Sequence, residues 1–251
     1  MLRSLDHIRN VTLQALDGEI GRCRDYIFDD RSWAIRYMVA DTGKWLPGRT
    51  VLIPPQALKK YAWESDVMVV DLTTEAVKSS PPLESDLPVS LQYEKRLFEH
   101  HRWPYRWIGT ESWGAAPFMD HSAGFSKPEQ EEPSPEESHL RSVKEVSGYR
   151  IQATDHAIGH VEDFLVEEDD WVIRYIVIDT RNWLPGRKVL ISPSWADAID
   201  YTRRRMHIRM NRSAVEHSPR YDPDQMLERA DEERLFEHYA ESPYWKKNLH
   251  E

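Results

Sequence analysis

A set of polar and aromatic side chains occurs twice in the chain, in the same order and with the same spacing. Its members are Arg36, Asp41, Trp45 and Arg49 in the first occurrence and Arg174, Asp179, Trp183 and Arg187 in the second. A guanidinium group presents several donors in a fixed fork that suits carboxylates and other anions. Arg36, Arg49 and Trp45 could therefore form a pocket for an anion or for a carboxyl terminus.

The alternative for these residues is structural, and we favour it. Arg36 lies on a strand face that is otherwise apolar, and an unpaired buried charge is costly. The candidate carboxylate partners are Asp25 and Asp41, with Asp163 and Asp179 in the second occurrence. This interpretation predicts an ion pair at the end of each fold, with Trp45 and Trp183 packed over it as a cover.

Motifs that mark catalytic sites are absent from the sequence. There is no G-x-S-x-G, P-loop, G-x-G-x-x-G or H-E-x-x-H pattern, and there is one cysteine. His100 and His101 are adjacent in an expected helix, so they point about 100° apart and do not chelate a metal readily. Cys23 has Val161 as its counterpart, which indicates a small buried apolar position. We predict neither an enzyme, nor a cofactor, nor a metal site.

A strand expected at 66–72 has a counterpart of different chemistry. Val67 and Val69 lie opposite its core face, which predicts an exposed apolar strip and hence an interface. The counterpart carries a basic stripe made of Arg203, Arg204, Arg205 and Arg209. Such a stripe could contact an acidic protein or RNA. Nucleic acid is the weaker option because no aromatic residues interleave with the arginines, and an ordinary solvated strand face is the third interpretation.

These residues belong to a repeat of domain size. Residues 2–107 align with 140–245 at a constant offset of 138, and more than a third of the aligned positions are identical. We interpret the repeat as an internal duplication that gives two domains, 1–107 and 140–251. The segment 108–139 between them holds seven acidic residues and one basic residue, and it is rich in Pro, Gly and Ser. We expect a disordered or extended linker there.

Each copy has the pattern of a small β-rich domain. Strands are predicted from apolar alternation in the first copy at 11–16, 19–28, 33–41, 50–53 and 66–72. The LPGR sequence before the fourth strand is typical of a tight turn. TTEAV predicts a short helix capped by Thr73 or Thr74, and 87–101 predicts a helical tail. The expected fold is mainly β with short helices, as two small β-barrels that are each followed by a helical tail.

One family resembles both copies. The run IGRCRDYIFDDRSWAIRYMVADTGKWLPGRTVLIPP, followed by VVDLTTEAVKSSPP, resembles the PRC-barrel family, and the resemblance covers residues 5–83 and 143–221. That family includes the cytoplasmic barrel of the photosynthetic reaction centre H subunit and the C-terminal barrel of a ribosome maturation factor. The WLPGR variant with its RLFEH tail resembles tandem PRC-barrel proteins of bacteria that have no assigned activity.

What the resemblance implies is a small β-barrel that serves as a docking module. The chain lacks the transmembrane helix of the H subunit and the N-terminal RNA-associated domain of the ribosome factor, so neither function is carried over. No apolar run approaches the roughly 18 residues of a membrane span, and the N-terminus does not look like a secretory signal. With a single cysteine, these features predict a cytoplasmic protein.

Three functions remain open. The first is a non-enzymatic scaffold for protein–protein interaction, with a protein partner or self-association. The second is a ribosome- or RNA-associated factor that uses the basic stripe, although a net charge of −10 argues against general nucleic-acid binding. The third is an enzyme or ligand binder at the Trp45 and Arg49 end. It is least favoured because small barrels fill their interiors with side chains.

Overall fold

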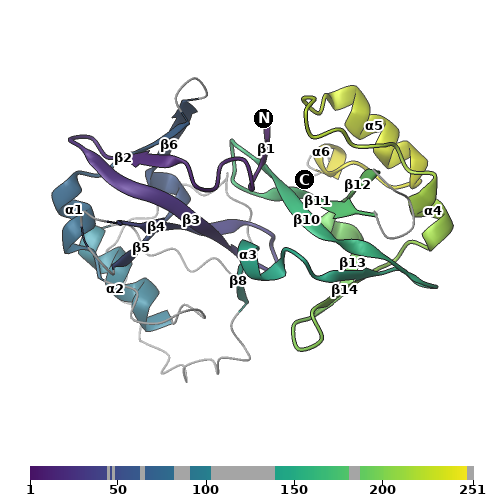
Figure 1. The fold of residues 1–251 in the computed structure, drawn as a ribbon, viewed down its shortest axis with the longest axis horizontal. Coiled ribbons are helices and arrows are strands. Elements are labelled where there is room, and N and C mark those ends of the chain that lie inside the picture. Colours follow the sequence, from purple (N-terminus) through teal and green to yellow (C-terminus); the bar gives the residue numbers. More distant parts are fainter. Residues whose placement is uncertain are drawn as a thin grey trace, which may run out of the picture. The chain divides into compact units, whose positions relative to one another are not determined.

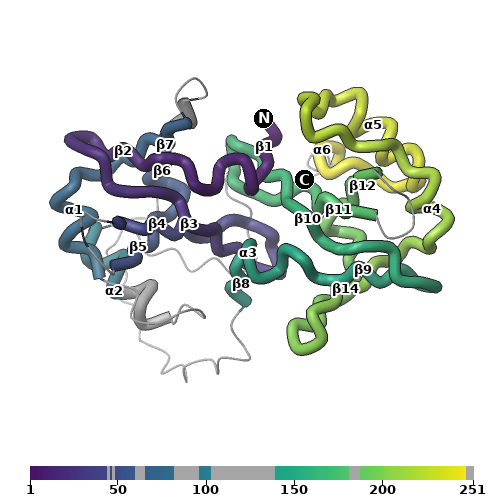
Figure 2. Tube along the Cα trace, in the orientation of Figure 1, coloured from purple at the N-terminus to yellow at the C-terminus, as the bar shows by residue number. Residues whose placement is uncertain are grey.

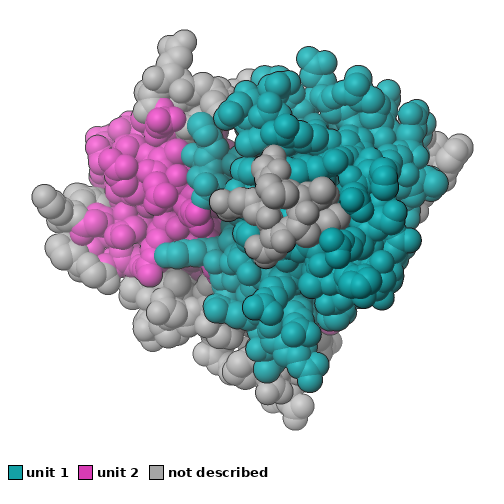
Figure 3. Space-filling model, turned by 45° about the vertical axis from the view of Figure 1, so that its right-hand side comes forward, with its two compact units in different colours: residues 1–7, 143–168, 172–251 teal, residues 8–142, 169–171 magenta. Residues whose placement is uncertain are grey.

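The computed structural model describes residues 1–43, 46, 49–62, 66–81, 91–102, 139–180 and 187–247. The chain divides into two compact units, which are coloured separately in Figure 3. Unit 1 comprises residues 1–7, 143–168 and 172–251, and unit 2 comprises 8–142 and 169–171. Each unit is built on a mixed seven-stranded sheet with short helices, so the predicted mainly β class with short helices is confirmed.

The sheet of unit 2 follows the strand order β5-β4-β3-β2-β7-β6, and its seventh strand, β8, pairs with β3 (Figure 1). The strands are β2 (Thr12–Gln14), β3 (Glu19–Asp29), β4 (Ile35–Asp41), β5 (Thr50–Ile53), β6 (Leu58–Ala62), β7 (Val67–Val70) and β8 (Leu140–Ser142). Neighbouring strands are antiparallel except for β2 and β7, which are parallel.

In the described part of unit 2, this sheet is accompanied by helices α1 and α2 and by the 3-10 turn η1 (Pro55–Ala57). Helix α1 (Thr74–Ser79) begins after Thr73, whose hydroxyl accepts the Ala76 N–H at 3.2 Å, so the predicted cap is confirmed. Helix α2 (Leu91–His101) is the predicted tail. Its Leu97 is fully buried in a core cluster with Ile27, Tyr37, Val39 and Leu52. The tail therefore belongs to the hydrophobic core of unit 2.

The sheet of unit 1 has the equivalent order, β12-β11-β10-β9-β14-β13, with β1 paired to β10. Its strands are β1 (Leu2–Ser4), β9 (Arg150–Gln152), β10 (Ala157–Glu167), β11 (Ile173–Asp179), β12 (Lys188–Ile191), β13 (Ala196–Asp200) and β14 (Arg205–Ile208). Its helical elements are α3 (Val143–Val146), η2 (Pro193–Trp195), α4 (Arg212–Glu216), α5 (Arg229–His238) and α6 (Tyr244–Lys247).

The tail of unit 1 packs through aromatic side chains. Figure 2 follows the chain from α4 into α5 and α6, which lie together at one end of the unit. Phe236 of α5 is buried, and its ring centroid lies 5.3 Å from that of Trp195 and 5.4 Å from that of Trp245. Large aromatic side chains bury much apolar area and favour such edge-to-face contacts. As in unit 2, the tail completes the core.

The first strand of each repeat lies in the sheet that the other repeat builds. Strand β1 pairs with β10 at 165–167, and β8 pairs with β3 at 27–29. The two compact units therefore differ at these strands from the linear domains 1–107 and 140–251 that we expected. The physical reason is the length of β10: β9 pairs only with its start, at 157–160, so its later part has an open side that a second strand can satisfy.

Positive φ angles occur at the same positions in the two repeats. Trp33 has a φ of 58° and Trp171 a φ of 55°, so each ends a turn and β4 begins only at Ile35. Gly21 has a φ of 116° and Gly159 a φ of 148°, and an added Cβ would overlap the carbonyl oxygen of Asp41 or Asp179. Only glycine tolerates both conditions, which accounts for the repeated Ile-Gly pair.

Other expectations fall outside the described residues, namely most of the WLPGR turns and the linker up to residue 138. Within the described ranges, none of the helices combines the length and hydropathy required of a membrane-spanning helix.

Candidate functional site

The repeated aspartates hold the exchanged first strands. The Ser4 hydroxyl donates to Asp163 Oδ2 at 2.5 Å, and the Asp6 N–H donates to Asp163 Oδ1 at 2.9 Å. In the same way, the Ser142 hydroxyl donates to Asp25 Oδ2. Burial raises the pKa of the Asp163 carboxyl, while these hydrogen bonds oppose the shift. Asp163, which we expected to pair with an arginine, is instead an anchor for a serine.

Arginines of the exchanged strands add a second anchor. Arg3 Nη2 lies 3.1 Å from Glu168 Oε2, and Arg141 Nε lies 3.3 Å from Asp30 Oδ2. Asp30 also contacts His139, whose Nδ1 lies 3.0 Å from Asp30 Oδ1. Arg3 and Arg141 are equivalent in the repeat, and so are their acidic partners. The tripeptide Leu-Arg-Ser therefore recurs because both copies use it in the same contact.

The arginines of the WLPGR phrase bind backbone. Arg49 Nη2 donates to the Ser80 carbonyl oxygen, and Arg187 Nη2 donates to the Ser218 carbonyl oxygen. In each unit this contact ties the start of a strand to the end of a short helix, α1 or α4. The hydroxyl of Thr42 donates to the Arg49 carbonyl oxygen at 2.8 Å, which fixes the same turn from the other side. These contacts give Arg49 and Arg187 structural roles.

The tail helices reach the same place. His101 Nε2 lies 2.7 Å from the Ser80 hydroxyl, and His100 Nε2 lies 3.1 Å from the Ser79 hydroxyl. Burial, followed by the neighbouring His100, lowers the pKa of His101 to about 4. In each unit, then, the WLPGR arginine and the Ser-Pro sequence meet next to one another, and in unit 2 the tail histidines join them.

The remaining members of the repeated set occupy different environments in the two units. Asp41 is exposed and accepts the Gly43 N–H at 2.9 Å, so it caps a turn where we expected an ion pair with Arg36. Asp179 is buried, with His160 Nε2 at 3.8 Å from its Oδ2. Arg174 lies over the Tyr244 ring, 4.4 Å from its centroid. Trp45 and Trp183 lie outside the described residues, and Arg36 is half-buried.

A buried carboxylate beneath the tail of unit 1 was not predicted. Glu232 is 3% exposed and accepts hydrogen bonds from the hydroxyls of Tyr175, at 2.6 Å, and Tyr244, at 3.0 Å. Arg229 Nη1 lies 3.0 Å from its other oxygen. Burial raises the pKa of Glu232. Every group in this network has a partner, so it fastens α5 and α6 to the sheet.

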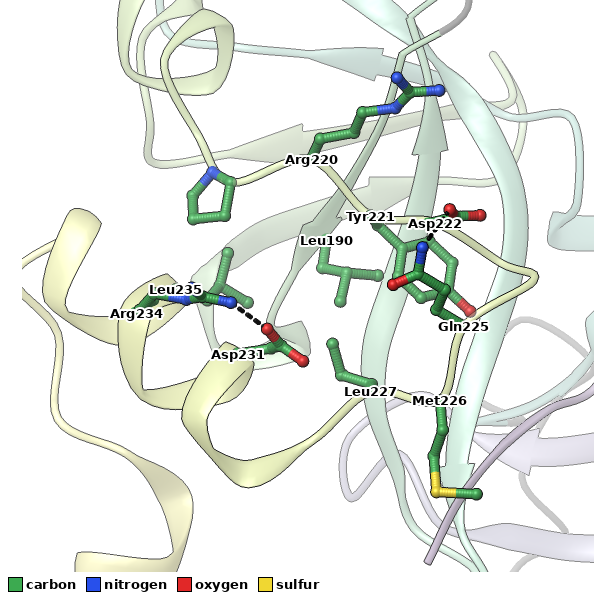
Figure 4. A pocket seen from close by; sticks show the side chains of 11 residues that line it. Leu190, Arg220, Tyr221, Asp222, Gln225, Met226, Leu227, Asp231, Arg234 and Leu235 are labelled. Atoms are coloured by element: carbon green, nitrogen blue, oxygen red, sulfur yellow. Dashed lines mark hydrogen bonds and ion pairs between the residues drawn. The ribbon is translucent and has the colours of Figure 1, made fainter.

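A small hollow in unit 1 lies between the α4–α5 connection and the sheet (Figure 4). Its volume is about 100 Å³, well below the roughly 300–1,000 Å³ of ligand pockets. Three of its charged residues are engaged, because Arg234 binds Asp231 and Gln225 donates to Asp222 at 2.9 Å. We therefore do not assign it a ligand.

Most arginines of the basic stripe have partners inside unit 1. Arg203 is paired with Asp200, at 3.6 Å, and Arg209 with Glu241, at 3.3 Å. The Arg204 guanidinium lies 5.9 Å from the centroid of the Tyr149 ring. These three arginines are thus engaged within unit 1.

Arg205 instead has an arginine neighbour that the sequence analysis missed. The parallel register places Arg150 of β9 directly beside Arg205 of β14, and His207 lies two residues farther along that face. Both arginines are exposed. We call Arg150, Arg205 and His207 the basic face. Arg150 is the first residue of β9. Its position beside Arg205 follows from the pairing of β9 with β14, which are far apart in the sequence.

The corresponding surface of unit 2 is neutral. Thr12 and Val67 take the places of Arg150 and Arg205, and Val69 takes that of His207. Val67 and Val69 are half-buried, so the apolar strip that we expected there is only partly exposed. In the sheet, β7 lies between β2 and β6.

The described ranges contain no group of three or more His, Cys, Asp or Glu side chains with the geometry of a metal site. Cys23 is 1% exposed, and burial raises the pKa of its thiol to about 12. Cys23 is therefore a buried packing position, as the sequence predicts.

Comparison with protein families finds a PRC-barrel domain at residues 140–214. The matched segment contains β8 to β14 and the first residues of α4. No curated protein matches the chain.

Proposed function

We propose that the chain is a non-enzymatic docking module made of two PRC-barrels in tandem, which arose by duplication. The PRC-barrel domain at 140–214 supports one barrel, and the equivalent strand order of unit 2 supports the second. The sequence identity between the repeats supports a common origin. In this proposal the basic face of unit 1 binds an acidic segment of a protein partner.

The observation that carries the proposal is the pair of adjacent arginines. Arg150 and Arg205 are direct neighbours on parallel strands, both are exposed, and neither side chain has a hydrogen bond or ion pair within the described part of the chain. Like charges side by side in a sheet are destabilising. Carboxylates from a partner would remove this repulsion and would also steer the encounter.

RNA is the alternative occupant, because phosphate groups would neutralise the same two charges. The basic face has no Phe, Tyr or Trp on which bases could stack, and stacking contributes much of single-strand affinity. We therefore favour the acidic protein. We place the contact in the cytoplasm, where a lone thiol such as Cys23 remains reduced.

The test compares two double variants as baits for affinity capture. Arg150→Glu with Arg205→Glu reverses the basic face, and Arg31→Glu with Arg220→Glu makes the same charge change at two exposed arginines elsewhere. We expect the first variant to lose a defined set of acidic proteins that the wild type and the second variant retain. Equal capture by both variants would contradict the proposal, and capture that nuclease abolishes would favour RNA.

A further inference from the structure

We propose that each unit contains a specific binding slot for an extended Leu-Arg-Ser segment, and that these slots hold the two repeats together independently of the linker. The slot of unit 1 is the open side of β10 at 165–167, and that of unit 2 is the open side of β3 at 27–29. The occupant of each slot is the first strand of the other repeat in the same chain. This inference does not depend on the proposed docking function.

Backbone pairing provides the first part of the recognition. The Leu5 N–H donates to the Phe164 carbonyl oxygen at 2.9 Å, and the Glu168 N–H donates to the Met1 carbonyl oxygen at 2.9 Å. The added strand thus extends the antiparallel sheet, which is the mode by which many domains bind extended peptides. Main-chain bonds give affinity in this mode, and side chains give specificity.

The serine provides the specificity. Ser4 donates to Asp163, which is half-buried, and Ser142 donates to Asp25, which is buried. A first strand without the serine hydroxyl would leave that carboxylate without one of its donors. The loss of a hydrogen-bond partner from a polar group that is shielded from water lowers the free energy of unfolding. Arg3 adds selectivity through Glu168, as Arg141 does through Asp30. The slot therefore fits an Arg-Ser strand better than an arbitrary one.

The chain path gives this recognition a consequence. Residues 1–7 belong to unit 1 and residue 8 begins unit 2, while 139–142 belong to unit 2 and residue 143 resumes unit 1. If the chain is cut between 108 and 138, the N-terminal fragment still supplies β1 to unit 1, and the C-terminal fragment still supplies β8 to unit 2. Separation of the fragments requires the removal of both strands.

The first experiment inserts a specific protease site between residues 128 and 137 of the full chain and cleaves the purified protein. We expect the two fragments to elute together with the mass of the uncut chain, 29.6 kDa. Ser4→Ala with Ser142→Ala should weaken their association by about tenfold or more, while Ser213→Ala, at an exposed serine, should not. Fragments that separate at once, or equal effects of the two changes, would overturn the proposal.

A peptide challenge tests the specificity of the slot. The cut complex is diluted until part of it dissociates and is then mixed with excess MLRSLDH, the sequence of residues 1–7. We expect this peptide to increase the separated fraction, and the matched peptide MLRALDH to be much less effective. Equal effects of the two peptides, or no effect of either, would refute recognition of the serine.

A disulfide trap tests the occupant and remains informative if the cleaved protein unfolds. Leu2 and Glu167 face each other in a non-hydrogen-bonded pair, since the bonded pairs are those of Leu5 with Phe164 and of Met1 with Glu168. Oxidised Leu2→Cys with Glu167→Cys should run as a cross-linked monomer on a non-reducing gel. A covalent dimer would assign the slot to a second copy, and no cross-link would refute the pairing.

Discussion

Unit 1 and unit 2 have equivalent sheets and equivalent anchors but different surfaces. Both hold an exchanged strand through a serine and an aspartate, and both tie an arginine to the carbonyl group of a Ser-Pro sequence. On the β9–β14 pair, however, unit 1 presents Arg150 and Arg205, whereas the β2–β7 pair of unit 2 presents Thr12 and Val67.

The difference separates the residues that build the fold from those that are available for contacts. Among the charged residues, Arg49 and Arg187 are identical in the two repeats, and each is engaged inside its own unit. Arg150 and Arg205, which differ from their counterparts in unit 2, are instead exposed. Identity between the repeats is therefore a guide to structure, and divergence between them is a guide to binding.

The largest expected effect tests whether the glycine before the long strand's main pairing is required equally in both units. Gly21→Ala and Gly159→Ala would each place a Cβ on a carbonyl oxygen, at a positive φ. We expect each change to lower the free energy of unfolding by about 3 kcal/mol or more. Urea unfolding measures the loss. A loss at only one of the two glycines would show that the units are not equivalent there.

The next effect concerns the anchor of the exchanged strand in unit 1. Asp163→Ala removes the acceptor of the Ser4 hydroxyl and of the Asp6 N–H, so we expect a loss of about 2 kcal/mol. Asp163→Asn keeps the shape and an acceptor oxygen and is the matched control. An alanine variant as stable as the wild type would show that the anchor contributes nothing.

The pH dependence of the same residue has a definite sign. Because burial raises the pKa of Asp163 in the folded protein above the ordinary value of 3.8, the native state keeps this proton to a higher pH than the unfolded chain does. The associated stability is fully present below pH 3.8 and is lost as the pH rises through the raised pKa. Asp163→Asn should therefore lose less stability than the wild type across this window. Parallel curves from urea unfolding at several pH values would contradict the shift.

A smaller effect compares the two arginine contacts of the WLPGR phrase. Arg49→Ala and Arg187→Ala each remove a charged donor from a buried carbonyl group, and we expect losses of about 1–2 kcal/mol in both units. Thermal unfolding provides the measurement, and Arg31→Ala, at an exposed arginine, provides the control. An unchanged midpoint together with altered ligand binding would restore the anion-pocket interpretation.

The smallest effect concerns Cys23, whose counterpart is Val161. Cys23→Val makes the two positions alike, and we expect a change of less than about 1 kcal/mol in the free energy of unfolding. The raised pKa, about 12, and the burial of the thiol predict that it reacts with a thiol reagent at pH 8 only after unfolding. Rapid labelling of the native protein would contradict this environment.

Local patterns predicted the elements that depend on local sequence. The strands near 19–28, 33–41 and 50–53 followed from apolar alternation, and the helix after Thr73 followed from its cap. What could not be predicted depends on pairing between distant residues. The neighbour of Arg205 and the partner of Asp163 are set by strand register, which no local pattern contains.

The exchanged strands nevertheless left a signal in the sequence. Leu-Arg-Ser is identical at 2–4 and 140–142, although none of the nine positions that follow it in the two repeats matches. A short identical segment within a stretch that otherwise differs indicates a specific contact. Here the contacts are those of Ser4 with Asp163 and of Ser142 with Asp25. The half-burial of Val67 and Val69 was missed for a related reason, because the strands that flank β7 were only partly identified.

Hydrogen–deuterium exchange of the full chain tests the central claim, that each sheet is completed by the first strand of the other repeat, most directly. Asp163→Ala should remove protection from residues 2–5 and leave that of 140–142 intact, and Asp25→Ala should do the reverse. If Asp163→Ala instead deprotected 140–142, or if residues 2–5 were unprotected in the wild type, the exchange of strands would be contradicted.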